Sequence, residues 1–405
     1  MRRLLNIDYA LVQAFYWMLY SPAGVFVSAI LLGKGYSNSS IGVIIAVGCL
    51  VAILLQTAIT HITDRIKVVT NIGMIKVLLL ALIIAVLLIL FIGEKSVAMT
   101  ISYIGLIVLY TAMHPFVNAL SFTLEETGYQ VNYGVGRSMG SLASGVLCFA
   151  TGYLIAWFYP DVVLYIGLLN LSLMTVVVFV TDHHYRKAMG TSELPAKETA
   201  KTVVKVETDA ISMRDFLKRN RIFTVMSIGI AGLFFGNVII ENFTLQIVEG
   251  VGGSSENMGI IIFLLSVFEM PAMLGFHKLK ERFSYVFLLR ISAIFFTIKI
   301  IIMYFAGSMA AFYLAQLCQI PGYGLLFPAI VSFIDHIMEK GEALRGQAVF
   351  TVAMTLGNVI GSVAGGVILD LYNPRTLLMI GSLVSAAGTI LIVALIHRVE
   401  KERTC

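Results

Sequence analysis

The chain of 405 residues is 59% hydrophobic and only 13% charged, and its mean hydropathy is +0.91. Soluble globular domains carry about 25% charged residues, so this composition excludes an ordinary soluble protein and indicates one embedded in lipid. At about 20 apolar residues per transmembrane helix, the length suits twelve helices with short loops. We attribute the formal net charge of +5 to membrane topology, so no nucleic-acid partner is expected.

Apolar runs bounded by glycine, proline or charged clusters predict six transmembrane helices in the first part of the chain. They cover approximately residues 8–31, 40–61, 69–92, 97–120, 134–158 and 161–181. A second set of six covers approximately residues 221–248, 256–276, 285–306, 309–334, 344–369 and 375–396. The sequence therefore predicts an all-α membrane protein.

The segment between the two sets, residues 182–220, has no run long enough to span a bilayer and is rich in charged residues. We expect a cytoplasmic linker that includes a short amphipathic helix from Ser212. The predicted domains are therefore an N-terminal six-helix half, this linker, a C-terminal six-helix half and a short tail, at residues 1–181, 182–220, 221–398 and 399–405.

Lysine and arginine are distributed unevenly between the predicted loops. If the N-terminus lies inside, the outer loops hold only Lys34, Lys95 and Arg375, and all other loop cations lie inside. Positive residues are enriched in cytoplasmic loops, so we expect both termini in the cytoplasm and the protein in the plasma membrane.

The two sets of helices share an internal repeat. GKGYSNSSIGVII at residues 33–45 aligns with GVGGSSENMGIII at residues 250–262, an offset of 217 residues. Two further matches share this offset: Asp64-Arg65 with Glu281-Arg282, and Met139-Gly140 with Leu356-Gly357. Three separated matches in one register indicate two pseudo-symmetric six-helix halves, with a substrate site between them near the bilayer midplane.

Ionisable residues at membrane depth are costly and are candidate functional groups. Glu269 lies in the eighth predicted span and Lys299 in the ninth. A lysine side chain is long enough for the two groups to meet. They form either a permanent structural pair or a cavity-facing pair whose carboxylate binds substrate or a proton. Glu241, near the outer end of the seventh span, fits an outer-gate or interfacial group better than a proton carrier.

Polar and aromatic residues also mark the first and fourth spans. Tyr16 and Tyr20 share a helix face with Gln13, and this stripe suits either stacking on a solute ring or packing against lipid and neighbouring helices. His114 precedes Pro115, and a proline inside a span frees a backbone carbonyl that can line a cavity.

Several motifs resemble the major facilitator superfamily, in particular the branch of lactose permease-like, phenylpropionate permease-like and nucleoside:proton symporters. They are GYSNSSIG after the first span, the Asp64-Arg65 loop, PFVNAL in the fourth span, YGVGRSMGS in the fifth, a glutamate in the eighth and a cation in the ninth. The resemblance covers essentially the whole chain and implies alternating-access transport.

The resemblance assigns expected roles to individual residues. It implies a gating role for the loop charges Asp64, Arg65, Glu281 and Arg282, and the alternative is that these charges are solvated and only hold tight turns. It implies that Arg137 binds substrate or pairs with Glu125 or Glu126. From the sequence pattern alone, Arg137 could equally be an interfacial arginine that contacts lipid phosphates. Asn118 stands where relatives often carry an aspartate, which removes one titratable site.

The tenth span departs from the lactose permease pattern. Gln319 and Gly322 stand where a histidine and a glutamate take part in proton translocation in those relatives. Proton coupling therefore does not carry over directly, and the proton remains a possible coupling ion that Glu269 would have to bind. We expect no other cofactor and no metal.

The sequence thus favours a secondary transporter, most simply a proton-coupled symporter of a sugar, nucleoside or aromatic acid that works as a monomer. An exporter or a passive facilitator of the same fold is the alternative. An enzyme is not expected, because no catalytic constellation and no phosphate-binding loop occurs in the sequence.

Overall fold

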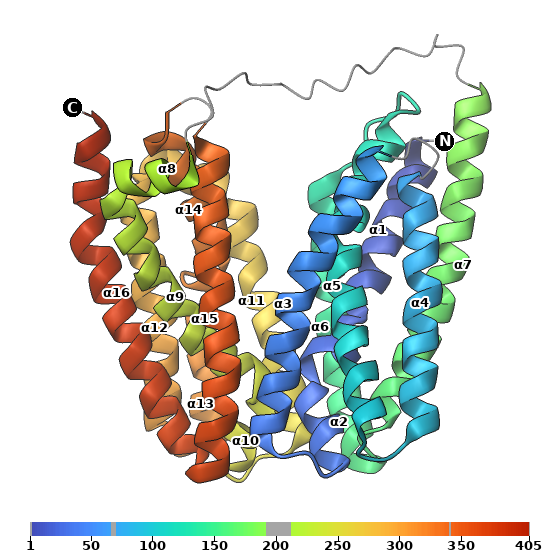
Figure 1. Ribbon diagram of the computed structural model, residues 1–405, viewed down its shortest axis with the longest axis horizontal. Helices are drawn as coiled ribbons and strands as arrows, with labels where there is room; N and C mark the ends of the chain where they lie inside the picture. The colour runs from blue at the N-terminus through green and yellow to red at the C-terminus, as the bar shows by residue number, and fades with distance from the viewer. Residues whose placement is uncertain (1, 66–69, 192–211, 340–341, 405) are drawn as a thin grey trace. The chain divides into compact units, whose positions relative to one another are not determined.

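The computed structural model describes residues 2–65, 70–191, 212–339 and 342–404, and every regular element in these ranges is a helix (Figure 1). By their internal contacts the residues divide into two compact units. Unit 1 comprises residues 1–195 together with 253–266, and unit 2 comprises residues 196–252 together with 267–405. Residues 253–266 thus group with unit 1 although they follow part of unit 2 in the chain.

The predicted number of spans is confirmed. Within the described ranges, eleven helices are long and apolar enough to cross a membrane, and a bent helix pair near the N-terminus makes twelve when it is taken as one span. The bent pair covers Arg2–Val25 and Val27–Gly33, with an angle of 46°. The chain is therefore an all-helical, multi-span membrane protein.

Unit 1 is built from six spans (Figure 1). Its elements are α1 (Arg2–Met18), the π-helix η1 (Ser21–Val25), α2 (Val27–Gly33), α3 (Asn38–Arg65), α4 (Asn71–Ile92), α5 (Val97–Glu125), α6 (Tyr133–Trp157) and α7 (Val162–Thr191). The first half of α11 (Ser255–Arg282) also belongs to it. Helix α1 packs against α6 and α7, whereas α5 packs against α3 and α4.

The first span bends at Phe26, directly after a π-helix that contains Pro22. Pro22 cannot donate a backbone hydrogen bond, and the chain around it forms the π-helix η1, in which the Phe26 amide donates to the Ser21 carbonyl. The Tyr103 hydroxyl of α5 donates to the Pro22 carbonyl at 3.0 Å. This bond compensates the irregular backbone inside the membrane, where every polar backbone group needs a partner.

Helix α7 is longer than the sequence predicted. It continues to Thr191 instead of ending near residue 181, so the predicted linker starts too early. Two polar contacts stabilise the extra turns: Asp182 forms an ion pair with Lys76 of α4 at 2.5 Å, and His184 Nδ1 lies 2.7 Å from Asp8 Oδ2 of α1. The short helix expected from Ser212 is confirmed as α8 (Met213–Arg219), whose N-terminus the Ser212 side chain caps.

Unit 2 contains the remaining spans. Its elements are α8, α9 (Arg221–Asn242), α10 (Thr244–Glu249), the second half of α11, α12 (Tyr285–Phe305), α13 (Met309–Ala315), the 3-10 helix η2 (Gln316–Gln319), α14 (Tyr323–Ile337), α15 (Ala343–Leu371) and α16 (Pro374–Thr404). Helix α9 lies at its centre and packs against both α15 and α16, while α12 packs against α14 and α16.

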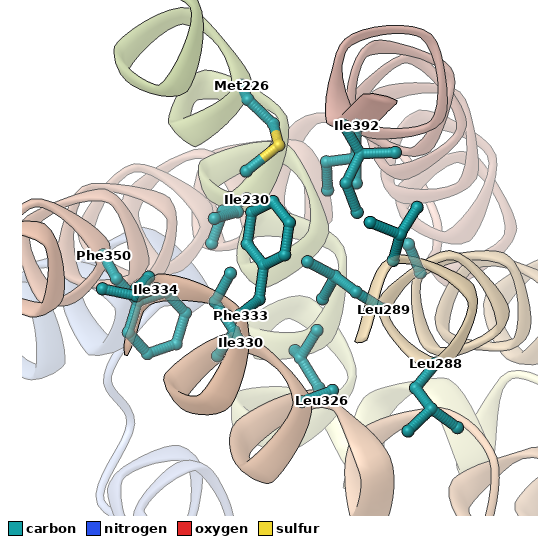
Figure 2. Close-up of a cluster of buried hydrophobic side chains, with 14 of the residues drawn as sticks. Met226, Ile230, Leu288, Leu289, Leu326, Ile330, Phe333, Ile334, Phe350 and Ile392 are labelled. Atoms are coloured by element: carbon teal, nitrogen blue, oxygen red, sulfur yellow. The ribbon is translucent and has the colours of Figure 1, made fainter. Parts of the chain in front are cut away.

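A continuous apolar cluster fills the interior of unit 2 (Figure 2). Met226 and Ile230 of α9, Leu289 of α12, Phe333 of α14 and Ile392 of α16 all contribute, and each is at most 2% exposed. Because lipid tails are as apolar as these side chains, this cluster stabilises the unit mainly through close packing.

Candidate functional site

Helices α1, α5 and α6 bring a polar and aromatic group together in unit 1. Gln13 of α1 is fully buried, and the hydrogen bonds of this group converge on it. Its amide nitrogen donates to the Tyr9 hydroxyl at 2.8 Å and to Asn118 Oδ1 of α5 at 3.3 Å, and its amide oxygen accepts from the Trp17 indole at 3.2 Å. Asn118 Nδ2 lies 3.0 Å from His114 Nε2.

Aromatic rings extend this group along α1 and α5. Tyr16 stacks on Tyr110 with ring centroids 4.9 Å apart, and His114 stacks on Tyr16 at 5.8 Å. Tyr20 also stacks on Tyr110, at 6.1 Å. Tyr16 is buried, whereas Tyr20, His114 and Asn118 are partly exposed. The buried ring therefore supports side chains that a solute can reach.

Arg137 of α6 completes the group. Its guanidinium lies over the Trp17 ring, 3.8 Å from the ring centroid, and donates to Ser141 Oγ at 2.8 Å. Glycines on either side of it explain this position: a side chain at Gly136 would overlap Tyr9, and a Cβ at Gly140 would lie 2.5 Å from Trp17 Cδ1. The YGVGRSMGS motif therefore lets α6 approach α1 closely enough for Arg137 to reach Trp17.

The expected pairing of Arg137 with Glu125 or Glu126 is wrong for this conformation. Glu125 accepts a hydrogen bond from the Val131 backbone amide at 3.1 Å, and Glu126 accepts one from the Tyr185 hydroxyl at 2.8 Å. Both carboxylates lie at the end of α5 and tie it to its own loop and to α7, whereas Arg137 points to α1.

A second ionisable group lies in unit 2. Lys299 of α12 is only 4% exposed, and its ammonium donates to Gln319 Oε1 of η2 at 2.9 Å. Glu241 of α9 accepts from Asn237 Nδ2 at 2.7 Å. Glu241 of α9 and Glu269 of α11 are ionisable neighbours of Lys299.

Glu269 lies on α11 and is partly exposed. Gly324 of α14 packs closely on its backbone, since a Cβ at Gly324 would lie 2.9 Å from the Glu269 carbonyl oxygen. The hydrogen bond of Lys299 goes to Gln319, so in this conformation the expected meeting of Lys299 with Glu269 is replaced by a bond to a neutral amide.

The predicted gating residues are only partly described. Asp64 and Arg65 end α3, and their side chains lie outside the described part of the chain. Glu281 and Arg282 end α11, where His277 Nδ1 lies 3.3 Å from Glu281 Oε1 one turn away. Their role in gating stays a prediction.

Sequence reasoning missed Tyr110 and Asn237. Tyr110, His114 and Asn118 follow one another at intervals of four residues, and so do Asn237 and Glu241. This spacing places side chains on one helix face and was the available signal. Within the described ranges, no three His, Cys, Asp or Glu side chains gather as a metal site would require.

Comparison with known proteins identifies the family. The family model described as "MFS_1 like family" matches residues 9–380. The chain belongs to this family. It is a transporter of the major facilitator type and not an enzyme.

Individual relatives are distant. The chain is 24% identical over 274 residues to the Bacillus subtilis (strain 168) protein named "Uncharacterized transporter YwbF", an alignment covering 67% of this chain and 63% of that protein. The fold is similar to that of a mutant of the nucleoside transporter NupG, with a TM-score of 0.79, 14% identity and coverage of 96% and 99% of the two chains. The fold is also similar to that of a mutant of the peptide transporter POT, with a TM-score of 0.68 and 12% identity. This match covers 98% of this chain and 95% of that chain.

Proposed function

We propose that this MFS_1 like transporter is a proton-coupled symporter that carries a small organic solute across the plasma membrane, works as a monomer and has both termini in the cytoplasm. Ionisable groups buried at membrane depth carry the proposal, above all Lys299, which is 4% exposed and has Glu241 and Glu269 as ionisable neighbours. Such groups are rare in membranes unless they bind a substrate or an ion. The similar folds of proteins named as nucleoside and peptide transporters support this reading.

In this proposal the two units contribute different functions. The group around Arg137, Trp17, His114 and Asn118 offers a cation, an exposed ring edge and amide groups, which suit a sugar, a nucleoside or an aromatic acid. The group around Lys299 contains Glu241 and Glu269, the carboxylates that can bind and release the coupling proton.

Transport by the purified protein in proteoliposomes tests the proposal. Radiolabelled sugars, nucleosides and aromatic acids are offered under an imposed inward proton gradient, with empty liposomes as control. We expect at least one solute to accumulate above its external concentration and the accumulation to collapse when a protonophore is added. Accumulation that survives the protonophore would refute proton coupling, and gradient-driven efflux of hydrophobic cations would favour an exporter.

A further inference from the structure

Arg290 is a charged residue inside a membrane-spanning helix that the proposed transport does not use. It is the sixth residue of α12, and apolar residues surround it in the sequence of that helix. A guanidinium in hydrocarbon is costly, so an arginine within a span needs polar partners. The groups around Arg290 therefore indicate what it binds.

The protein satisfies only part of this guanidinium. Arg290 Nη2 donates to the Val393 carbonyl of α16 at 3.3 Å, and Arg290 makes no other hydrogen bond or ion pair with the described residues. Its Nε is buried and has no hydrogen-bond partner. Because arginine stays protonated and carries several N–H donors, its charge and most of its donors are left for a ligand.

Helices α12 and α16 run antiparallel, and two hydrogen bonds define their register. Arg290 donates to the Val393 carbonyl, and Thr389 donates to the Ala293 carbonyl at 3.0 Å. Residue numbers therefore rise along α12 as they fall along α16. The N-terminal end of α12 consequently lies beside the C-terminal end of α16, with Arg290 just inside this shared end.

Arg290 lies on a face of α12 that points away from the apolar cluster of unit 2. Leu289 of α12 and Ile392 of α16, the chain neighbours of the two bonded residues, are 1% exposed and lie in that cluster (Figure 2). Arg290 itself is partly exposed, and Phe287, three residues earlier on the same helix face, is 45% exposed. The guanidinium is therefore accessible from outside the unit.

Exposed aromatic and cationic side chains lie between Arg290 and the shared end of the two helices. Phe283 and Phe287 stack with ring centroids 5.1 Å apart and are 43% and 45% exposed. His397 and Lys401 follow the residue that Arg290 contacts by one and two turns of α16, and both are exposed. This end thus presents positive charge beside exposed apolar rings.

On the other side of Arg290, the same face of α12 is apolar. Ile294 and Ile298 follow Arg290 at intervals of four residues and are partly exposed. A ligand that reaches Arg290 from outside the unit therefore meets a cation first and hydrocarbon side chains deeper in the span. This order of groups matches a phospholipid, whose phosphate precedes its acyl chains.

We propose that the edge formed by α12 and α16 binds an anionic phospholipid, with Arg290 donating to its phosphate. The planar guanidinium suits phosphate oxygens and reaches the interface from within a span. Lys401 attracts the negative headgroup, whereas Glu400, a carboxylate at this end, lies 3.3 Å from His397 Nδ1. By the expected topology the lipid belongs to the inner leaflet, where basic segments attract anionic lipids.

Lipid binding by the purified, delipidated protein tests the proposal. Dioleoyl phosphatidylglycerol is titrated into the detergent solution, and native mass spectrometry counts the bound lipid while thermal unfolding reports its effect. We expect this lipid to bind and to raise the melting temperature more than phosphatidylcholine with the same acyl chains. Arg290→Gln should weaken its binding at least about tenfold, since the hydrogen bonds to a charged group are lost.

Two further variants separate the site from the fold. Arg375→Gln, at the opposite end of α16, is the matched control and should bind phosphatidylglycerol as the wild type does. Arg290→Lys keeps the charge but loses the planar fork, so its affinity should lie between those of the wild type and Arg290→Gln. If Arg290→Gln does not fold, wild-type affinity in Arg290→Lys overturns the proposal.

Other results also decide against an anionic lipid at this edge. Equal binding of phosphatidylglycerol by Arg290→Gln and the wild type overturns the proposal, as does equal stabilisation by phosphatidylcholine. Glycerol 3-phosphate is the probe without acyl chains. If it stabilises the wild type as strongly as phosphatidylglycerol does, the site binds a soluble phosphate and the assignment to a lipid is wrong.

Discussion

Arg137 differs from three other cations of unit 1. Lys34 pairs with Asp161, and Lys76 and Arg186 pair with Asp182, whereas Arg137 stacks on a ring and bonds to a neutral hydroxyl. In the proposed function this charge would bind the solute. This observation favours a role in binding over the interfacial arginine that the sequence left open.

Replacing Arg137 tests that role. We expect Arg137→Gln to raise the half-saturating solute concentration at least about tenfold, because a hydrogen bond to a charged group contributes about 1.5–3 kcal/mol. Arg137→Lys should recover only part of the affinity, since lysine keeps the charge but loses the planar fork. Uptake kinetics in proteoliposomes give the values. If the half-saturating solute concentration of Arg137→Gln equals that of the wild type, Arg137 has a structural role and does not bind the solute.

The pair between Lys76 and Asp182 makes a prediction about stability. Lys76→Met leaves a carboxylate whose side chain is only 14% exposed with Arg186 as its remaining partner. We expect the free energy of unfolding to fall by about 1–3 kcal/mol, which is less than the roughly 3–5 kcal/mol lost when a fully buried pair is broken. Thermal unfolding in detergent measures it. The double variant Lys76→Met/Asp182→Leu should regain part of the loss, and a further decrease would contradict this account.

At the scale of elements, glycines set the distances between helices. Gly229 of α9 and Gly388 of α16 face each other, since a Cβ at Gly388 would lie 2.5 Å from the Gly229 carbonyl oxygen. Small residues allow such close approach in membrane helices, and backbone atoms cannot rotate away as a side chain can. The crossing of α9 and α16 therefore depends on these two positions.

Gly388→Ala should consequently destabilise unit 2. We expect the free energy of unfolding to fall by about 1–3 kcal/mol, which is typical of overpacking, and the melting temperature in detergent to fall with it. Gly275→Ala in α11 is the control, because a Cβ there meets no atom within 4 Å and alanine favours a helix. Equal melting temperatures for the two variants would show that the close contact does not determine stability.

The sequence predicted the spans well and their irregularities poorly. All twelve apolar runs became helices, because a bilayer demands an intrahelical partner for each backbone group. Pro22 signalled its bend, but Pro115, Pro271 and Pro328 lie inside continuous helices. Composition does not distinguish these cases, because a proline is compatible with a continuous helix as well as with a π-helix.

The candidate site was predictable by residue but not by contact. Arg137 and Lys299 were singled out as ionisable residues at membrane depth, and Gln319 by its position in the lactose permease pattern. Their partners were not identifiable. Trp17 contacts Arg137 where glycines let α1 and α6 approach closely. Gln319 contacts Lys299 from the 3-10 helix η2 that interrupts the tenth span. Both arrangements depend on helix rotation, which one sequence does not specify.

At the scale of the whole molecule, the internal repeat predicts a structural equivalence. Superposing the two six-helix halves of an experimental structure should bring Gly42 onto Gly259 and Asp64 onto Glu281, because both pairs share the offset of 217 residues. Duplicated halves keep their internal register even where the sequences have diverged. A best superposition shifted by more than about one helical turn, roughly 5.4 Å along the axis, would show the sequence matches to be accidental.

The orientation in the membrane is the last prediction. Translocating lysine and arginine is unfavourable, so the sparse cations at Lys34, Lys95 and Arg375 should mark the outer face. In a background with Cys49→Ala and Cys405→Ser, we expect a membrane-impermeant thiol reagent added to whole cells to label Lys95→Cys. The same reagent should label Arg214→Cys, on exposed helix α8, only after the cells are broken. Labelling of Arg214→Cys in intact cells, with Lys95→Cys protected, would reverse the topology. The linker and both termini would then face outward, against the charge distribution.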